Sequence, residues 1–417
     1  MYKILHCADL HLDSPLRGLE ADPDAPADRI RGATRAAFTN LVDFALEQNV
    51  AVVLIAGDLY DGDWQDWRTG QFLIRELERL TRTGIQIVAI SGNHDAESVI
   101  TRKLRWPDGA KLLSTAQAET VRFPELALAV HGRGFPTKAV TESLLPSYPR
   151  PTPGMLNIGM LHTAATGRPG HERYAPCTIE QLAAHGYDYW ALGHIHAREI
   201  LCRDPWIVFP GNLQGRHVGE EGAKGATLIM VEDQKIVGEP THHDLDVVRW
   251  RRLRIDLAGA ADEDAALARI RHDLADALAG AEGRLLAVRL HLTGATGAHA
   301  ALVGSAGATL ERIRGEALAA GGGGTMWLEQ VEIETVPPAA PSLRDPMQEL
   351  LLQNVAAANA TGLVVELQAY ATQVLERSPG LRVALGEDHP AARVAAGEIA
   401  PSLMAQARAL LLAKLGA

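Results

Sequence analysis

Aspartate, asparagine and histidine recur in five short motifs in the first half of the chain. The motifs are Asp9-Leu10-His11, Gly57-Asp58, Gly92-Asn93-His94-Asp95, His162 and Gly193-His194-Ile195-His196. Carboxylate, amide and imidazole groups without a thiolate form a ligand set that suits divalent ions such as Mn, Fe, Co or Zn. With His94 and Asp95 left aside, seven such groups are too many for one ion, and a carboxylate can bridge two ions. The motifs therefore predict a two-ion centre, whose chemistry is phosphoester hydrolysis.

Each motif taken alone also has an ordinary structural interpretation. An aspartate at the end of a strand is commonly a turn or helix-capping residue, and a Gly-Asn pair is commonly a tight turn. His194-Ile195-His196 places both rings on the same side of an extended segment, which permits metal binding without requiring it. The occurrence of all the motifs in order, each at the end of an expected strand, favours the metal centre.

The elements that must position these residues follow from the apolar pattern. Short apolar runs alternate with amphipathic stretches from Tyr2 to about Val231, which is typical of a layered α/β or α+β fold. We expect strands at Tyr2–Ala8, Ala51–Ala56, Ile85–Ile90, Leu126–His131, Leu156–Leu161, Tyr187–Leu192, Trp206–Phe209 and Ala226–Val231. The first three strands are expected to be parallel and buried. Ligands of α/β sheets bind at the carboxyl ends of strands, so we expect the motifs to converge there.

Composition shifts divide the chain into three expected domains. Residues 1–247 contain all the motifs. Residues 248–335 have the pattern of a small α/β domain, with strands at 248–257, 285–292 and 326–334, helices at 262–278 and 310–318, and a flexible glycine run at 321–324. Prolines 337, 338 and 341 indicate a linker, and residues 336–417 are rich in alanine and leucine at helical spacing. We expect this last region to be helical.

Five segments of the chain, DLHLD, GDLYD, GNHD, MLHT and GHIH, resemble the motifs of the calcineurin-like metallophosphoesterase superfamily. More narrowly, DLHLDSPLRGL and FPGNLQGRHVGEEGAKG resemble segments of the SbcD/YhaO-type DNA repair exonucleases, a family of double-strand-break repair nucleases. The resemblance covers residues 1–247 and, more weakly, 248–335. It implies a four-layer β-sandwich flanked by helices, a small α/β capping domain that binds DNA and a helical C-terminal region.

The resemblance also implies roles for the site residues. Asp9, His11, Asp58 and His196 would hold one ion, and Asp58 would bridge to a second ion held by Asn93, His162 and His194. The ions would be Mn2+, with Mg2+, Fe2+, Co2+ or Zn2+ as alternatives. His94 would lie beside the phosphate as the catalytic residue, with Asp95 as its orienting partner. Three further residues are candidates for supporting or substrate-binding roles: Asp61, Arg216 and His217.

The activity implied by the resemblance is hydrolysis of DNA phosphodiester bonds by a water or hydroxide activated by the two metals. We expect an exonuclease with some endonuclease capacity. The implied partners are DNA and an SbcC-like coiled-coil ATPase, for which residues 336–417 are a candidate docking element. The alternatives for this region are packing on its own domain or formation of a homodimer.

Two other functions are consistent with parts of the sequence. A phosphodiesterase or phosphatase that acts on a small phosphoester or nucleotide would use the same centre, since fold does not determine substrate. A noncatalytic scaffold on the same fold is the other alternative, and the intact ligand set argues against it.

Net charge at first disfavours a polyanionic partner. The chain carries −11 at pH 7, and residues 1–247 hold 24 basic and 32 acidic residues, a net charge of −8. Two divalent ions would bring this value to about −4 and make the site itself electropositive. The run Arg249, Arg251, Arg252 and Arg254 around Trp250 is a candidate DNA contact, with a solvated strand face and a packed tryptophan as the alternative.

Cysteine content and hydropathy indicate the compartment. Cys7, Cys177 and Cys202 are odd in number and widely spaced, so a disulfide framework is not expected. We find neither an apolar run long enough to span a bilayer nor the pattern of a signal peptide at the first residues. The sequence therefore predicts a cytoplasmic protein without membrane contact.

Overall fold

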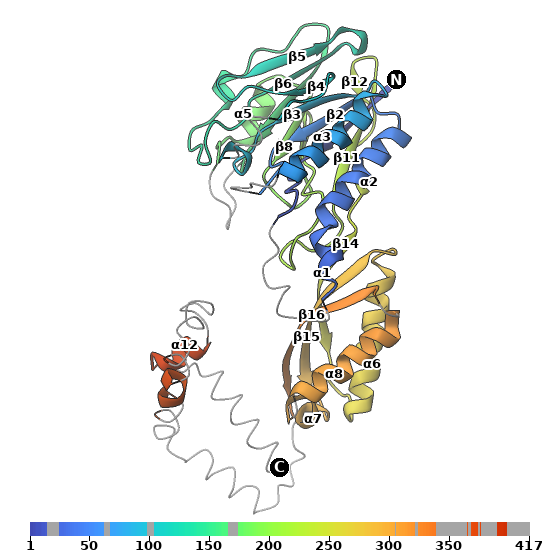
Figure 1. Ribbon diagram of the computed structural model, residues 1–417, viewed down its shortest axis with the longest axis vertical. Coiled ribbons are helices and arrows are strands. Elements are labelled where there is room, and N and C mark those ends of the chain that lie inside the picture. The colour runs from blue at the N-terminus through green and yellow to red at the C-terminus, as the bar shows by residue number, and fades with distance from the viewer. Residues whose placement is uncertain are drawn as a thin grey trace, which may run out of the picture. The chain divides into compact units, whose positions relative to one another are not determined.

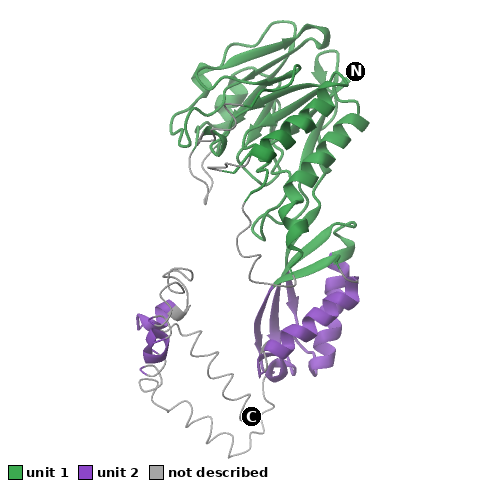
Figure 2. Cartoon of the chain, viewed as in Figure 1, with its two compact units in different colours: residues 1–252, 278–289, 322–329 green, residues 253–277, 290–321, 330–417 purple. Residues whose placement is uncertain are grey.

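The structure is a computed structural model (Figure 1). It describes residues 1–14, 25–61, 67–97, 104–165, 174–304, 306–321, 324–338, 365, 368–373, 376 and 390–397. The chain divides into two compact units (Figure 2): residues 1–252, 278–289 and 322–329 form unit 1, and residues 253–277, 290–321 and 330–417 form unit 2. Within the described ranges, no helix is both long enough and apolar enough to cross a membrane.

Unit 1 contains a seven-stranded sheet with the order β12-β11-β1-β2-β3-β4, in which β13 also pairs with β11. Strands β1, β2, β3 and β4 are parallel to one another, and β11 is antiparallel to β1. The bounds are β1 Tyr2–Cys7, β2 Val52–Ala56, β3 Gln86–Ile90, β4 Ala110–Leu112, β11 Gly225–Glu232, β12 Lys235–Ile236 and β13 Thr241–Asp244. Both faces of β2 are covered, which explains its continuous apolar sequence.

A second sheet of unit 1 has six strands in the order β5-β6-β7-β8-β10-β9. Strands β6, β7, β8 and β10 are parallel, and the edge strands β5 and β9 are antiparallel to their neighbours. The bounds are β5 Glu119–Phe123, β6 Leu128–Gly132, β7 Leu156–His162, β8 Tyr189–Gly193, β9 Glu199–Arg203 and β10 Trp206–Phe209. Both sheets therefore contain parallel strands, at whose carboxyl ends ligands can bind.

The two sheets pack face to face through alternate residues of their strands. Ile4 and Leu54 of the first sheet belong to the same fully buried cluster as Val130, Ile158 and Ala191 of the second. Because side chains alternate across a strand, the intervening residues point to the outer faces and require cover. Removing large apolar side chains from water in this way is the main stabilising contribution to such a sandwich.

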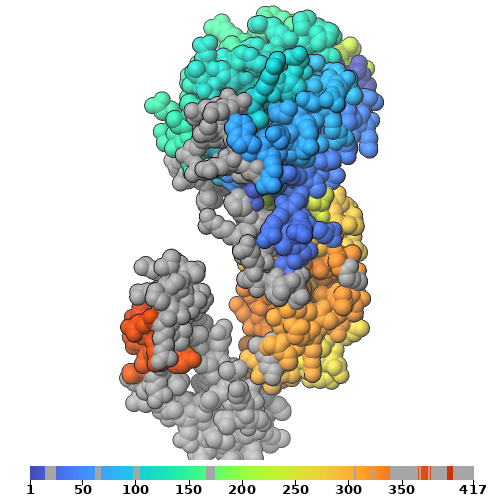
Figure 3. All heavy atoms as spheres, in the orientation of Figure 1, coloured from blue at the N-terminus to red at the C-terminus, as the bar shows by residue number. Residues whose placement is uncertain are grey.

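Helices cover the outer face of the first sheet. Leu41 of α2 (Ala33–Glu47) and Leu77 of α3 (Trp67–Thr81) lie in one buried cluster with Val53 and Ile55 of β2. Figure 3 shows side chains of α2 and α3, in blue and light blue, at the surface of unit 1. These helices form the outer layer on this side of the sandwich.

The outer face of the second sheet is covered more by loop than by helix. Leu182 of α5 (Ile179–Ala184) packs in one cluster with Trp190, and Phe135 and Leu144 of the segment before β7 join it. The N-terminus of α5 is closed by a capping box between Thr178 and Gln181. The expected α/β fold with a sandwich flanked by helices is confirmed, with a fourth layer that consists mainly of loop segments.

A third sheet has the order β14-β15-β16 and alternates with helices along the chain. The bounds are β14 Val248–Asp256, α6 Glu263–Ala279, β15 Leu285–Ala295, α7 His299–Gly304, α8 Ala306–Gly321 and β16 Met326–Val336. The buried side of α6 includes Ile270 and Leu274, which gives this helix its apolar stripe. Helix α12 (Pro390–Ala395) is described in the expected C-terminal region, most of which lies outside the described residues.

All eight expected strands before residue 247 are present, and the first three are parallel and buried as expected. The structure adds strands β4, β5, β9, β12 and β13, and the helices α1 (Ala27–Arg31), α5 and α7. Within the described ranges it also adds three short 3-10 helices, Asp95–Glu97, Pro124–Leu126 and Leu145–Ser147. Most of these elements have five residues or fewer, which is too short to show a reliable periodicity.

Candidate metal centre

The expected ligands lie at the carboxyl ends of strands from both sheets of unit 1. Asp9, Asp58 and Asn93 follow β1, β2 and β3 of the first sheet. His162 ends β7, and His194 directly follows β8 in the second sheet. The structure therefore brings together motifs that are far apart in the sequence, at one end of the sandwich.

Local backbone conformation is unusual at these residues. Asp9, His11, Asp58 and His194 have φ angles of 52°, 41°, 51° and 97°, in the region that residues other than glycine rarely adopt. Each such residue costs roughly 1–3 kcal/mol and persists only where surrounding contacts impose it. Backbone hydrogen bonds supply those contacts, including Asp9 N–H to Gly57 O and His11 N–H to Asp58 O, both at 3.0 Å.

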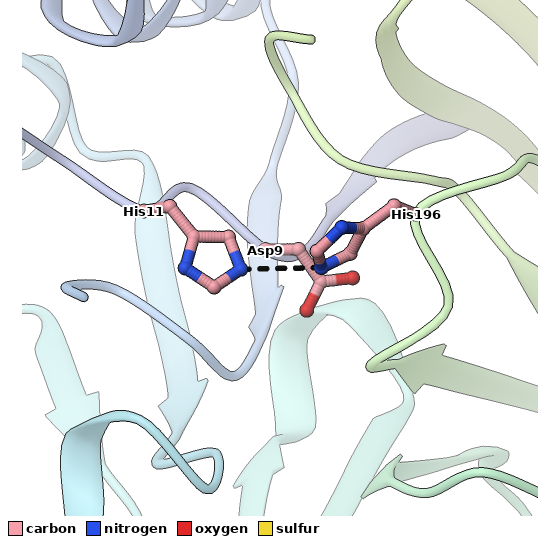
Figure 4. A group of neighbouring side chains, drawn as sticks. All are labelled: Asp9, His11 and His196. Carbon is pink, nitrogen blue, oxygen red and sulfur yellow. Dashed lines mark hydrogen bonds between the residues drawn. The ribbon is translucent and has the colours of Figure 1, made fainter. Parts of the chain in front are cut away.

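One cluster is formed by Asp9, His11 and His196, whose ligand atoms lie close enough to hold a common ion. The Nε2 atoms of His11 and His196 face each other at 3.2 Å, with the carboxylate of Asp9 beside them (Figure 4). The backbone N–H of His194 donates to both oxygens of Asp9, at 3.0 and 3.1 Å, and thereby orients this carboxylate.

A second cluster is formed by Asp58, His162 and His194, and Asn93 joins it. The Oδ1 atom of Asn93 lies 3.0 Å from His162 Nε2 and 3.2 Å from His194 Nδ1. His162 Nε2 is also 3.3 Å from Asp58 Oδ2. Four potential ligand atoms thus meet within a small volume.

Asp58 lies between the two clusters. Its Oδ1 accepts a hydrogen bond from the backbone N–H of His94 at 3.0 Å. Its Oδ2 is 3.3 Å from His162 Nε2 in the second cluster and 3.8 Å from His11 Nε2 in the first. This is the arrangement expected of a carboxylate that bridges two ions.

The residues fit metal ions because their ligand atoms need a positive charge between them. His162 Nδ1 donates to Ala56 O at 2.9 Å, so Nε2 is the ring nitrogen that faces the oxygens of Asp58 and Asn93. Burial opposes a charge on either residue of the buried pair, yet the Asp58 carboxylate raises the pKa of His162 to about 9. In turn, His162 outweighs burial and lowers the pKa of Asp58. A divalent cation would satisfy all of these groups at once.

Glycines make the close approach of these side chains possible. A Cβ atom on Gly92 would lie 2.2 Å from Asp58 Oδ1, and one on Gly57 would lie 2.4 Å from His162 Nδ1. Both distances are far below van der Waals contact, so the side chains could not keep their positions beside alanine. The glycines of the GDLYD and GNHD segments are therefore part of the construction of the site.

His94 lies at the edge of the clusters and is accessible. Its side chain is 33% exposed, which leaves room for a substrate, and its ring contacts that of His11 edge to face. His94 Nδ1 is 2.8 Å from Asp61 Oδ1. Burial acts to lower the pKa of His94, but the hydrogen bond with Asp61 and the charge of Asp58 raise it.

The structure corrects the expected partner of His94. Asp95 does not face the His94 ring: its oxygens accept hydrogen bonds from the backbone N–H groups of Leu59, Tyr60 and Gly92, at 2.9 to 3.1 Å. Asp95 thereby ties the GNHD segment to the GDLYD segment, and Asp61 takes the place beside the imidazole. Sequence proximity suggested Asp95, but a neighbour along the chain need not face the same ring.

Arg216 and His217 have different environments. Arg216 is 14% exposed and its guanidinium contacts Glu220 and Asp61. His217 is 63% exposed, and its Nε2 lies 3.6 Å from Glu220 Oε1. Both residues are therefore near the centre, but only His217 projects into solvent.

Sequence reasoning did not single out Glu220, although it lies in the quoted FPGNLQGRHVGEEGAKG segment. Glu220 Oε1 accepts a hydrogen bond from His196 Nδ1 at 2.7 Å, which leaves His196 Nε2 to face His11. A hydrogen-bonded carboxylate behind a histidine ligand is a common feature of metal sites.

The arginine run around Trp250 is only partly open to a partner. Trp250 is buried, donates through Nε1 to Gly215 O at 2.8 Å and packs edge to face on Trp327. Arg249 is also buried and pairs with Asp244 and Asp246. Three arginines of the run remain exposed: Arg251, Arg252 and Arg254. The packing alternative therefore applies to Arg249 and Trp250.

Comparison with known families agrees with this geometry. Residues 2–198 match the family model described as calcineurin-like phosphoesterase, and residues 250–336 match the model of the metallophosphoesterase YhaO middle domain. An uncharacterized metallophosphoesterase YhaO of Bacillus subtilis (strain 168) is 36% identical over 261 residues, which are 61% of this chain and 63% of the relative.

More distant relatives include proteins named for DNA repair and cleavage. DNA double-strand break repair protein Mre11 of Sulfurisphaera tokodaii is 26% identical over 54% of this chain and 59% of its own length. A subunit of the nuclease SbcCD from Staphylococcus epidermidis is 24% identical over 57% of this chain and 68% of its own length. The chain thus spans less than two thirds of the YhaO and Mre11 relatives.

The motifs, the sandwich and the clusters of ligand atoms agree with the family matches. Residues 2–198 are thus similar to calcineurin-like phosphoesterases, and residues 250–336 are similar to the middle domain of the metallophosphoesterase YhaO.

Proposed function

We propose that this protein is a metal-dependent nuclease that hydrolyses DNA phosphodiester bonds. In this proposal Asp9, His11, Asp58 and His196 hold one ion, and Asp58, Asn93, His162 and His194 hold the second. The observation that supports it most directly is the position of Asp58, whose Oδ2 faces ligand atoms of both clusters. Two divalent ions at such a centre lower the pKa of a water molecule and polarise phosphoryl oxygens. We propose Mn2+ as the physiological ion.

The residues of the chain would orient and protonate the substrate. Asp9 and Asp58 are held by backbone N–H groups of His194 and His94, so their free lone pairs have a defined direction. His94 is fixed through Nδ1 by Asp61, which leaves Nε2 to face the leaving oxygen. The raised pKa of His94 favours the protonated ring, which is the form required of a general acid.

DNA as the substrate rests on the relatives and on the domain organisation. Two of the relatives are named as a DNA double-strand break repair protein and as part of a nuclease. We further propose that residues 1–247 are the nuclease domain and that residues 248–335 form a capping domain that contacts DNA through its exposed arginines. An SbcC-like ATPase would be the partner, with residues 336–417 as the docking element.

The test is hydrolysis of a labelled linear duplex, a labelled single strand and bis-p-nitrophenyl phosphate. Each substrate is incubated with Mn2+, Mg2+, Zn2+ or chelator, with wild type and His94→Ala. His272→Ala is the matched control, because His272 is exposed on α6 and its ring faces Asp276. We expect metal-dependent DNA degradation that falls by roughly 100-fold or more in His94→Ala and is unchanged in the control.

Other outcomes would redirect the proposal. Turnover of the small diester with DNA untouched would favour the phosphodiesterase of small substrates, which the acidic net charge of −11 also favours. Hydrolysis that is equal in wild type and His94→Ala would exclude His94 as the general acid. The length pattern of the DNA products would show the polarity of cleavage.

A further inference from the structure

Behind the first cluster lies a buried ion-pair network that the proposed reaction does not use directly. Glu220 is 7% exposed. Its Oε1 accepts from His196 Nδ1 at 2.7 Å and from Arg216 Nη2 at 2.8 Å. Its Oε2 accepts from Asn212 Nδ2 and from the backbone N–H of Arg216, both at 2.9 Å, and from Arg216 Nε at 3.3 Å. Both oxygens are therefore surrounded by donors.

Arg216 extends this network to His94. Its Nη1 lies 3.3 Å from Asp61 Oδ2, and the other oxygen of Asp61 contacts His94 Nδ1 at 2.8 Å. Asp61 Oδ2 also accepts from Ser14 Oγ. One planar guanidinium thus joins the carboxylate behind a ligand of the first cluster to the carboxylate behind His94. Only the fork of an arginine can contact both carboxylates in this way.

We infer that Arg216 and Glu220 are positioning residues. Glu220 orients His196 toward the first ion. Arg216 contacts both Glu220 and Asp61, and it thereby holds His196 and His94 in fixed positions relative to each other. The inference rests on the proposed function, since it assigns the supporting groups of that same centre. It differs from the expectation of a substrate contact at Arg216, because each guanidinium nitrogen already has a carboxylate partner.

The chemistry of the pocket explains why a carboxylate is required at position 220. Glutamine has a similar shape but would direct an NH2 group at surrounding donors, and buried donors without an acceptor are destabilising. Aspartate keeps the charge but is one methylene shorter, so it would withdraw from His196. If only the charge of Glu220 matters, Glu220→Asp should bind Mn2+ as wild type does. If Glu220 positions His196, Glu220→Asp should bind Mn2+ more weakly.

The first experiment measures Mn2+ binding to the metal-free full chain by calorimetry, without substrate. We expect Glu220→Gln and Glu220→Asp each to lower the affinity of one Mn2+ site by about 10- to 100-fold, as is typical when a group behind a ligand is lost. Glu221→Gln is the matched control, because Glu221 is the adjacent exposed carboxylate and accepts from the backbone N–H of Arg252. It should bind Mn2+ as wild type does.

The second experiment separates positioning from substrate contact with Arg216→Lys, which keeps the charge and loses the fork. We expect kcat for a dinucleoside monophosphate, whose alkoxide leaving oxygen requires a proton, to fall by about 10- to 100-fold with little change in KM, because His94 is displaced. Arg203→Lys, in the exposed pair with Glu239, is the control. Cooperative thermal unfolding in chelator checks that each variant folds, and Arg216→Lys still tests the network if a Glu220 variant does not fold.

Two results would overturn the inference. One is Mn2+ binding by both Glu220 variants at wild-type affinity, and the other is an Arg216→Lys variant with raised KM and unchanged kcat. Failure of the proposed function is a separate result: wild type would bind Mn2+ and hydrolyse the small diester but leave DNA intact. In that case both experiments still report on the network.

Discussion

At the scale of single residues, the carboxylates of the centre are oriented largely by the backbone. The N–H groups of His194 and His94 hold Asp9 and Asp58, and three further N–H groups hold Asp95. Backbone groups in a packed sandwich have little freedom, so these oxygens keep their direction before any ligand binds. Such preorganisation reduces the rearrangement required when an ion or a substrate arrives.

Gly92 offers a sharp test of this construction. An alanine Cβ there would lie 2.2 Å from Asp58 Oδ1 and 2.7 Å from the Asp58 backbone nitrogen. We expect Gly92→Ala to displace Asp58, to weaken Mn2+ binding by at least about 10-fold and to reduce hydrolysis in parallel. Calorimetric titration with Mn2+ measures the first effect, and turnover of bis-p-nitrophenyl phosphate measures the second. Wild-type affinity in this variant would show that Asp58 is not a ligand in this position.

At the scale of elements, strand β1 contains a buried histidine outside the ligand set. His6 is completely buried between the sheets, with Nδ1 3.0 Å from Tyr189 Oη and Nε2 3.1 Å from Leu192 O. Burial lowers the pKa of His6 to about 3, although the hydrogen bond to Leu192 acts in the other direction. The neutral ring is thus part of the contact between the two sheets.

This histidine should make stability depend on pH. The unfolded chain binds a proton at His6 below about pH 6.5, but the folded chain does not until about pH 3, so stability falls as the pH decreases between these values. His6→Gln can keep both hydrogen bonds and does not titrate. We expect wild type to lose about 2 kcal/mol more than the variant between pH 7.5 and pH 5, measured by urea unfolding. Equal losses would contradict a neutral buried His6.

Helix α8 contains a glycine at a position where the structure does not require one. Gly315 is exposed, has ordinary helical conformation, and a Cβ atom there would meet nothing within 4 Å. We expect Gly315→Ala to stabilise the protein by about 1 kcal/mol, because alanine has the higher helix propensity. Urea unfolding measures this change, and hydrolysis should stay at the wild-type level. A destabilised variant would indicate a contact on this face of α8.

At the scale of the whole molecule, the proposed ions would link the two sheets of unit 1. Asp9, Asp58 and Asn93 follow strands of the first sheet, whereas His162 and His194 belong to strand ends of the second. An unfolded chain does not bring these groups together, so ion binding should favour the folded state. Metal binding and the stability of the sandwich are therefore coupled.

We expect Mn2+ to raise the thermal unfolding midpoint relative to chelator. At a concentration 100 times the Kd, one site contributes about 2.7 kcal/mol of stability. Asp58→Asn should lose most of this shift because it affects both clusters. The control is Asp43→Asn, since Asp43 is half-exposed on α2 and pairs with Arg79, and this variant should keep the full shift. A midpoint that does not respond to Mn2+ would contradict the metal centre.

The sequence by itself determined the sandwich strands, the alternation of strands and helices, and the groups that converge. These features depend on short-range information: an apolar run bounded by turn residues predicts a buried strand, and a motif that follows it must lie at the strand end. Asp9, Asp58 and Asn93 could be placed at one sheet edge in this way. The longer strands of unit 1 and the convergence of the motifs could be predicted from the sequence for the same reason.

Only the tertiary structure decided which groups support the centre. Asp61 rather than Asp95 faces His94, Arg216 is turned inward, and Glu220 lies behind His196. These contacts join residues 24 to 155 positions apart, and their side chains lie in loops, where no periodicity reports the direction of a side chain. The direction of a side chain in a loop depends on the packing of every element around it. A motif can therefore identify a ligand, but the partner behind the ligand is determined by the folded chain.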